Sequence, residues 1–92
     1  MKMTEEKIRA AVQLLRERGA RRVILFGSVI TAPTLARDVD FAVEGIPLRH
    51  LLEADVALQE LMQMPTDLVS REENPGFFDI IKDYGRTLFQ AA

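Results

Sequence analysis

Two aspartates at alternating positions, Asp38 and Asp40, constrain this chain more than any other feature of its sequence. They belong to the segment Asp-Val-Asp-Phe-Ala-Val, whose residue types predict a strand over 38–43. Side chains two apart on a strand share a face, so both carboxylates project together while Val39 and Phe41 face a core. At about 4 Å and an effective dielectric of about 20, two carboxylates repel by roughly 4 kcal/mol. A shared proton, a nearby cation or a bound metal must offset this repulsion, and oxygen ligands of this kind suit Mg²⁺.

A Gly-Ser pair precedes the aspartates by a nine-residue connection. It follows the run Arg-Val-Ile-Leu-Phe, which predicts a strand over 22–26 that is buried on both faces. Gly27 allows the backbone to turn there, and Ser28 offers a hydroxyl and a backbone N–H. Such a turn can hold a phosphate, although most Gly-Ser pairs in proteins are merely turns.

Asp67 is the third carboxylate of interest, because aspartate is depleted in strands and yet occurs in a predicted strand over 66–70. It either caps a turn at the strand start or has a function. If its strand neighbours strand 38–43, the three carboxylates meet on one face beside Gly27 and Ser28. That arrangement suits metal-assisted phosphoryl or nucleotidyl transfer.

The remaining pattern predicts a small α+β domain. Apolar residues at helical spacing, together with glycine and proline at the ends, indicate helices over 4–18, 48–63 and 75–89. With the strands between them, we expect an α/β sandwich: a mixed sheet of about three strands covered by helices, in a single domain spanning 1–92. The helix over 75–89 is unusually apolar, and part of its surface is expected to contact a partner or a second copy of the chain.

Composition excludes several classes of function. Twelve basic and fourteen acidic residues give a net charge of −2, which argues against a general nucleic-acid-binding surface. The chain has no cysteine and a single histidine, so thiolate metal sites and sites needing two histidines from one chain are excluded. The sequence contains neither an apolar run of membrane-spanning length nor a signal peptide, so the expected location is the cytoplasm.

The motifs together resemble a known family. The combination of Phe26-Gly27-Ser28, nine residues, and Asp38-Val39-Asp40-Phe41-Ala42-Val43 resembles the signature of the DNA polymerase β-like nucleotidyltransferase superfamily. The small size and the later Pro65-Thr66-Asp67-Leu68-Val69 make the chain similar to the minimal nucleotidyltransferase branch, many of whose members are antitoxins paired with HEPN-domain toxins. The resemblance implies the nucleotidyltransferase fold.

The resemblance also implies a reaction and roles for individual residues. The reaction is transfer of AMP from ATP, with Mg²⁺ as cofactor, to a tyrosine of a HEPN toxin, which silences the toxin. Asp38 and Asp40 correspond to the metal-binding pair, and Asp67 to a third acid that assists metal binding and deprotonates the acceptor. The phosphate-binding turn corresponds to Gly27 and Ser28, and Arg37 is the cation that remains near the acids.

Two other readings stay open. Many relatives carry a basic residue just after Gly-Ser, where this chain has Val29-Ile30. The chain could therefore be a non-catalytic module of the same fold that neutralises or bridges a partner by contact. A plain α/β domain with solvated acids is the third reading.

Overall fold

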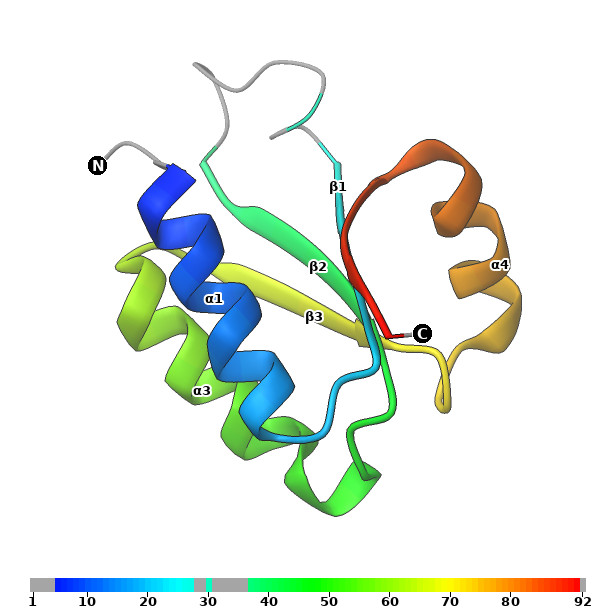
Figure 1. Cartoon of the computed structure of the whole chain (residues 1–92), viewed down its shortest axis with the longest axis horizontal. Coiled ribbons are helices and arrows are strands. Elements are labelled where there is room, and N and C mark those ends of the chain that lie inside the picture. The colour runs from blue at the N-terminus through cyan, green and yellow to red at the C-terminus, as the bar shows by residue number, and fades with distance from the viewer. Residues whose placement is uncertain (1–4, 28–29, 31–36, 92) are drawn as a thin grey trace.

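The fold is a four-stranded mixed sheet with helices on both faces (Figure 1). The computed structural model describes residues 5–27, 30 and 37–91. In this part of the chain the elements follow in the order α1 (Glu5–Glu17), β1 (Arg22–Phe26), β2 (Val39–Glu44), α3 (Leu48–Met62), β3 (Thr66–Ser70), α4 (Pro75–Tyr84) and β4 (Arg86–Gln90).

The strands are arranged in the order β3-β2-β1-β4. Strand β1 pairs antiparallel with both β2 and β4, whereas β2 and β3 run parallel. Helix α3 connects the two parallel strands, as a parallel pair requires. The predicted α+β class and mixed sheet are therefore confirmed.

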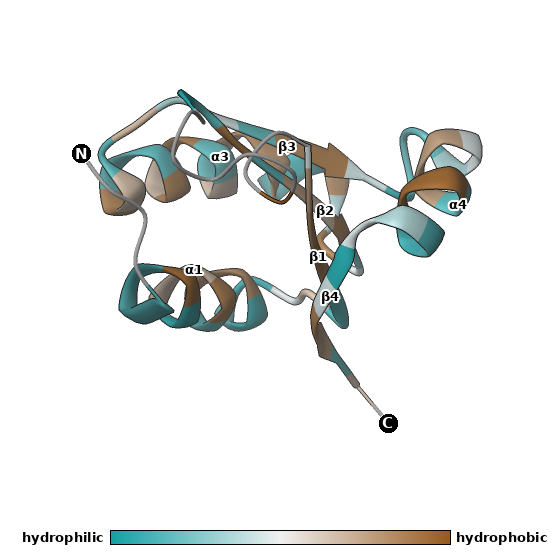
Figure 2. Cartoon of the chain, turned by 90° about the horizontal axis from the view of Figure 1, so that it is seen from above, coloured by the Kyte–Doolittle hydropathy of each residue, from teal (hydrophilic) through white to brown (hydrophobic). Residues whose placement is uncertain are grey.

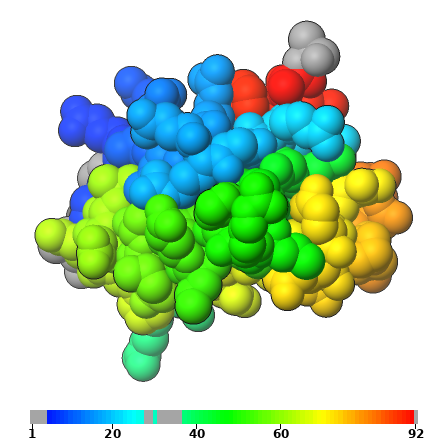
Figure 3. All heavy atoms as spheres, turned by 90° about the horizontal axis from the view of Figure 1, so that it is seen from below, coloured from blue at the N-terminus to red at the C-terminus, as the bar shows by residue number. Residues whose placement is uncertain are grey.

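The two faces of the sheet carry cores of different size. Helices α1 and α3 lie on one side of the sheet and α4 on the other (Figure 2). Alternate residues of β1 and β2 point to opposite faces. Val23, Leu25, Val39, Phe41 and Val43 face α1 and α3, and that core also takes in Leu15, Leu58 and Met62 from the helices. Helices α1 and α3 lie side by side over this face (Figure 3). The other face carries a smaller core, made of Ile24 and Ala42 from the sheet and Phe78 and Ile81 from α4.

The C-terminal prediction was wrong in one respect. The helix predicted over 75–89 ends at Tyr84, and Arg86–Gln90 forms the fourth strand instead. Gly85 has an extended backbone, with φ −82° and ψ 172°, which stops the helix. An irregularity in the pairing, between Val23 and Ile24 of β1, lets the adjacent Leu88 and Phe89 both contact the larger core, as a β-bulge does. The apolar residues at the end of the chain therefore complete the sheet rather than a helix.

Candidate functional site

The carboxylates predicted to form the site come from two parallel neighbours, β2 and β3. Asp40 of β2 is in register with Asp67 of β3, and residues paired in register point to the same face of a sheet. Val39 and Phe41, on either side of Asp40, are fully buried on the opposite face. The alternation predicted around Asp40 is thus confirmed. The strand predicted over 38–43 is shifted by one residue, since β2 begins at Val39 and Asp38 directly precedes it. The carboxylates of Asp40 and Asp67 lie on the face that α4 partly covers, because Asp40 is two residues before Ala42 of that core.

Asp38 adds a third charge directly before the first residue of β2. It is exposed, and it lies near enough to affect Asp40. The pKa of Asp40 is raised above its ordinary value of 3.8, first because of burial and then because of the negative charges of Asp38 and Asp67. The carboxylate of Asp40 therefore lies in a negative field that a cation would relieve.

Two contacts hold the strands that carry these acids. The Val39 N–H donates to the Pro65 carbonyl at 3.0 Å, which joins the starts of β2 and β3. The Thr66 hydroxyl donates to the Asp55 carboxylate of α3 at 3.1 Å. Thr66 directly precedes Asp67, so this bond fixes the point at which Asp67 enters the sheet. This bond gives Asp55, a half-buried acid of α3, a structural role.

Gly27 closes the other side of the site. Phe26, the last residue of β1, is paired with Asp40, so the turn at Gly27 begins beside that carboxylate. The φ of Gly27 is +84°, and a Cβ placed on this residue would collide with the Asp40 side chain. Only glycine allows both the left-handed turn and the close approach of the carboxylate. The Gly27 carbonyl accepts a hydrogen bond from the Ile30 N–H at 3.1 Å.

The two other predicted nucleotide-binding residues are Ser28 and Arg37. Ser28 lies outside the described residues, as does residue 29. Arg37 is exposed and directly precedes Asp38. The roles of both in binding phosphate remain predictions.

An aromatic pair that the sequence did not single out borders the carboxylates. The rings of Phe26 and Phe77 meet edge to face, with their centroids 5.8 Å apart. Phe26 is opposite Asp40 in the register, and Phe77 lies in the first turn of α4. The apolar character of α4 was the available signal. The aromatic pair could be assigned to the site only once the pairing of β1 with β2 was known.

The donor set fits a hard divalent cation in chemistry, since it consists of carboxylate oxygens in a negative field. Within the described residues, no group of three or more His, Cys, Asp and Glu side chains is arranged so that it could hold a metal ion. The metal-binding roles of Asp38, Asp40 and Asp67 therefore remain a proposal, supported by the register of β2 with β3 and by the raised pKa of Asp40.

Three solved structures resemble the whole described fold. The chain superposes on a mutant of the toxin-antitoxin MntA-HpeT with a TM-score of 0.77 and 22% identity, covering 98% of this chain and 75% of the other. For the toxin-antitoxin MntA-HepT the TM-score is 0.75 with 18% identity, covering 96% and 74%. For a toxin-antitoxin with AMP-PNP it is 0.76 with 24% identity, covering 97% and 75%. MntA is a minimal nucleotidyltransferase antitoxin.

The chain has the nucleotidyltransferase fold. No family model matches the sequence, and no curated protein matches it. At these identities the likeness concerns the fold, and the activity of the chain rests on its own residues. In this nucleotidyltransferase fold, the described helices include none that is both long and apolar enough to cross a membrane.

Proposed function

We propose that this chain is a Mg²⁺-dependent nucleotidyltransferase that transfers AMP from ATP to a protein hydroxyl, in the role of an antitoxin. The acceptor would be a tyrosine of a cognate HEPN toxin. The observation that carries the proposal is the pairing of Asp40 with Asp67 in parallel strands, beside a glycine turn that packs against the Asp40 carboxylate. The nucleotide-bound state of one similar toxin-antitoxin structure also supports it.

The proposed reaction is an in-line displacement at the α-phosphorus of ATP. The acceptor hydroxyl oxygen forms a bond to this phosphorus, the bond to the β-phosphate oxygen breaks, and pyrophosphate leaves. Asp67 would take the proton of the hydroxyl, the role that the family resemblance implies, and its exposed position leaves it accessible to an acceptor. Asp38 and Asp40 would hold Mg²⁺ with Asp67, and the ion would neutralise charge on the phosphates. Gly27 and Ser28 would hold the triphosphate, with Arg37 nearby.

A non-catalytic module is the second candidate, and exposed apolar residues on α4 favour it. Phe77, Ile80 and Tyr84 are 45%, 58% and 81% exposed. They stand at helical spacing and form one stripe, which is available to a partner or to a second copy of the chain. Masking of a toxin by contact would need this stripe but no intact carboxylates.

Incubation of the chain and its partner with ATP labelled at the α-phosphate separates these candidates. We expect Mg²⁺-dependent transfer of label by the wild type and a loss of at least about 100-fold in the Asp38→Asn/Asp40→Asn variant. Glu60→Gln, at an exposed position on α3, is the matched control and should retain activity. Formation of a complex without label in the wild type would contradict the enzyme and support the module.

Metal binding can be tested without a partner. Mg²⁺ that binds only the folded chain stabilises it, by about 2.7 kcal/mol at one hundred times its Kd. We therefore expect the melting temperature of the wild type to rise with Mg²⁺, and that of the Asp38→Asn/Asp40→Asn variant to stay constant. Equal responses of the two proteins would place the metal elsewhere.

A further inference from the structure

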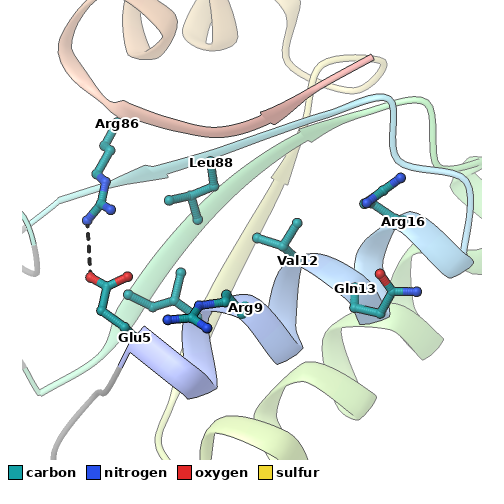
Figure 4. Close-up of a pocket in the computed structure, with 8 residues that line it drawn as sticks. Glu5, Arg9, Val12, Gln13, Arg16, Arg86 and Leu88 are labelled. Carbon is teal, nitrogen blue, oxygen red and sulfur yellow. Dashed lines mark ion pairs between the residues drawn. The ribbon is translucent and has the colours of Figure 1, made fainter.

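A groove of about 360 Å³ runs between α1 and β4 (Figure 4). Asp38, Asp40 and Asp67 are not among the residues that line it. Its apolar lining comes from Ile8 and Val12 of α1 and from Leu88 of β4. Leu88 contacts the core under α1 and α3, so the groove belongs to the sheet face opposite Asp40. The polar lining consists of Glu5, Arg9, Gln13, Arg16 and Arg86.

The groove is basic although the chain as a whole is acidic. Three arginines line it and only one acid does, whereas the whole chain has a net charge of −2. Glu5 pairs with Arg86 at 3.5 Å, which leaves the charges of Arg9 and Arg16 in excess. The Arg16 guanidinium lies 4.1 Å from the centroid of the Phe89 ring, so it is held in place along the groove. Oriented cations beside an apolar floor favour an anionic ligand that also has apolar groups.

The same groove borders an edge of the sheet. Strand β4 is the last strand on its side, and in the described part of the chain it pairs only with β1. Its outer backbone groups are thus available to another strand. An extended peptide that adds to such an edge presents alternate side chains to one face, here the face toward α1.

We propose that this groove binds an acidic, extended segment of a partner protein, which adds as a strand to the open edge of β4. Carboxylates of the segment contact Arg9 and Arg16, and its apolar side chains contact Val12 and Leu88. The proposal stands independently of the nucleotidyl transfer, because the residues that carry it share none with the carboxylate site.

Charge argues against a second copy of the chain as the occupant. Edge-to-edge pairing of two β4 strands would bring together two grooves, each with the excess positive charges of Arg9 and Arg16. Like charges across an interface are unfavourable. An acidic segment supplies the complementary charge.

Fluorescence anisotropy with a short labelled peptide of alternating valine and glutamate tests the proposal on the full chain. We expect saturable binding that weakens as salt is raised, because exposed charges are screened. A peptide of alternating valine and lysine is the matched probe and should not bind. Equal binding of both peptides, or binding of neither, would overturn the proposal.

Two further measurements test the residues and the strand pairing. Arg9→Glu/Arg16→Glu should weaken binding of the acidic peptide by about tenfold, whereas Arg49→Glu, exposed on α3, should leave it unchanged. Arg9→Gln alone avoids the loss of the contact between Arg16 and Phe89, and it should weaken binding in the same direction. N-methylation of alternate residues removes the backbone N–H groups along one edge of the acidic peptide. The peptide methylated along the edge that pairs with β4 should bind poorly. Unchanged affinity in the arginine variants or with both N-methylated peptides would rule the proposal out.

Discussion

Asp40 makes the stability of the chain depend on pH in a defined direction. Its pKa in the folded state is raised above the ordinary value of 3.8. Between these two values the folded state therefore keeps a proton that the unfolded state has lost, and the free energy of unfolding falls as the pH rises. Above the folded-state pKa this contribution of Asp40 to stability is completely lost. Asp40→Asn removes this decrease, and we expect it to be more stable than the wild type at neutral pH by roughly 0.2–1 kcal/mol.

Urea denaturation from about pH 3 to about pH 7 measures this effect. The control is Asp79→Asn, an exposed acid of α4 that forms an ion pair with Lys82 at 3.5 Å. In this control the free energy of unfolding should still fall with rising pH, because Asp40 is unchanged. A decrease that persists in Asp40→Asn would show that the charge of Asp40 does not destabilise the fold.

Gly27 and Asp40 should be energetically coupled. Gly27→Ala places a Cβ against the Asp40 carboxylate at a φ of +84°, so it should lower the free energy of unfolding by about 1–3 kcal/mol. In Gly27→Ala/Asp40→Ala the collision is relieved and only the cost of the backbone conformation remains. A double-mutant cycle should thus give a coupling energy of at least about 0.5 kcal/mol. Additive effects of the two substitutions would contradict the packing of the carboxylate against the glycine.

At the scale of elements, the sequence identified the strands with the strongest local signals. Strand 22–26 and strand 66–70 have the bounds predicted, and helix α3 differs by one residue at its end. Segment 86–90 was missed because Leu88 and Phe89 continue the helical spacing of α4, while the bulge that lets both face the core exists only once β4 pairs with β1. Long-range pairing decided that segment, and local periodicity could not show it.

Gly76 in α4 and Gly85 at the C-terminal end of this helix should respond oppositely to substitution by alanine. Gly76 lies in the first turn, and a Cβ there would meet nothing within 4 Å, so Gly76→Ala should stabilise the chain by about 0.5–1 kcal/mol. A Cβ on Gly85 would lie 2.5 Å from Ile24 Cγ2 and 2.9 Å from the Leu25 carbonyl oxygen. Gly85→Ala should therefore destabilise it by about 1–3 kcal/mol. Thermal unfolding of both variants tests the turn that ends α4, and similar effects of the two would contradict it.

The candidate site was predictable in part for the same reason. The alternation within one strand correctly placed Asp40 on the face opposite Val39 and Phe41. Asp38 directly precedes β2, so the face that it was predicted to share with Asp40 remains a prediction. Asp67 can approach Asp40 only if β3 lies beside β2. This neighbourhood was a condition of the prediction, because no local pattern predicted it. The contact of Phe77 with Phe26 depends on how α4 crosses the sheet, and no local pattern encodes that crossing.

For the whole molecule, the sheet separates two layers of unequal size (Figure 2). Helices α1 and α3 cover the larger core, while α4 is held by Phe78 and Ile81 against Ile24 and Ala42. The candidate site and the exposed stripe of α4 belong to the thinner layer. The basic groove between α1 and β4 belongs to the thicker one, so the two surfaces can act on different ligands.

This asymmetry predicts that α4 opens before the rest of the fold. Few buried apolar contacts give a low free energy of local opening, so the amides of α4 should exchange with solvent faster than those of α1 and α3. Native-state hydrogen exchange measured by mass spectrometry resolves the helices. Phe78→Ala should lower the opening free energy of α4 by up to about 3–5 kcal/mol, because Phe78 is fully buried in the smaller core. Ile80→Glu, at a 58% exposed position of the same helix, should leave it nearly unchanged. Exchange of α4 at the same free energy as α1 and α3 would mean that the two layers unfold together, and the thin layer could not then rearrange around a partner without loss of the whole fold.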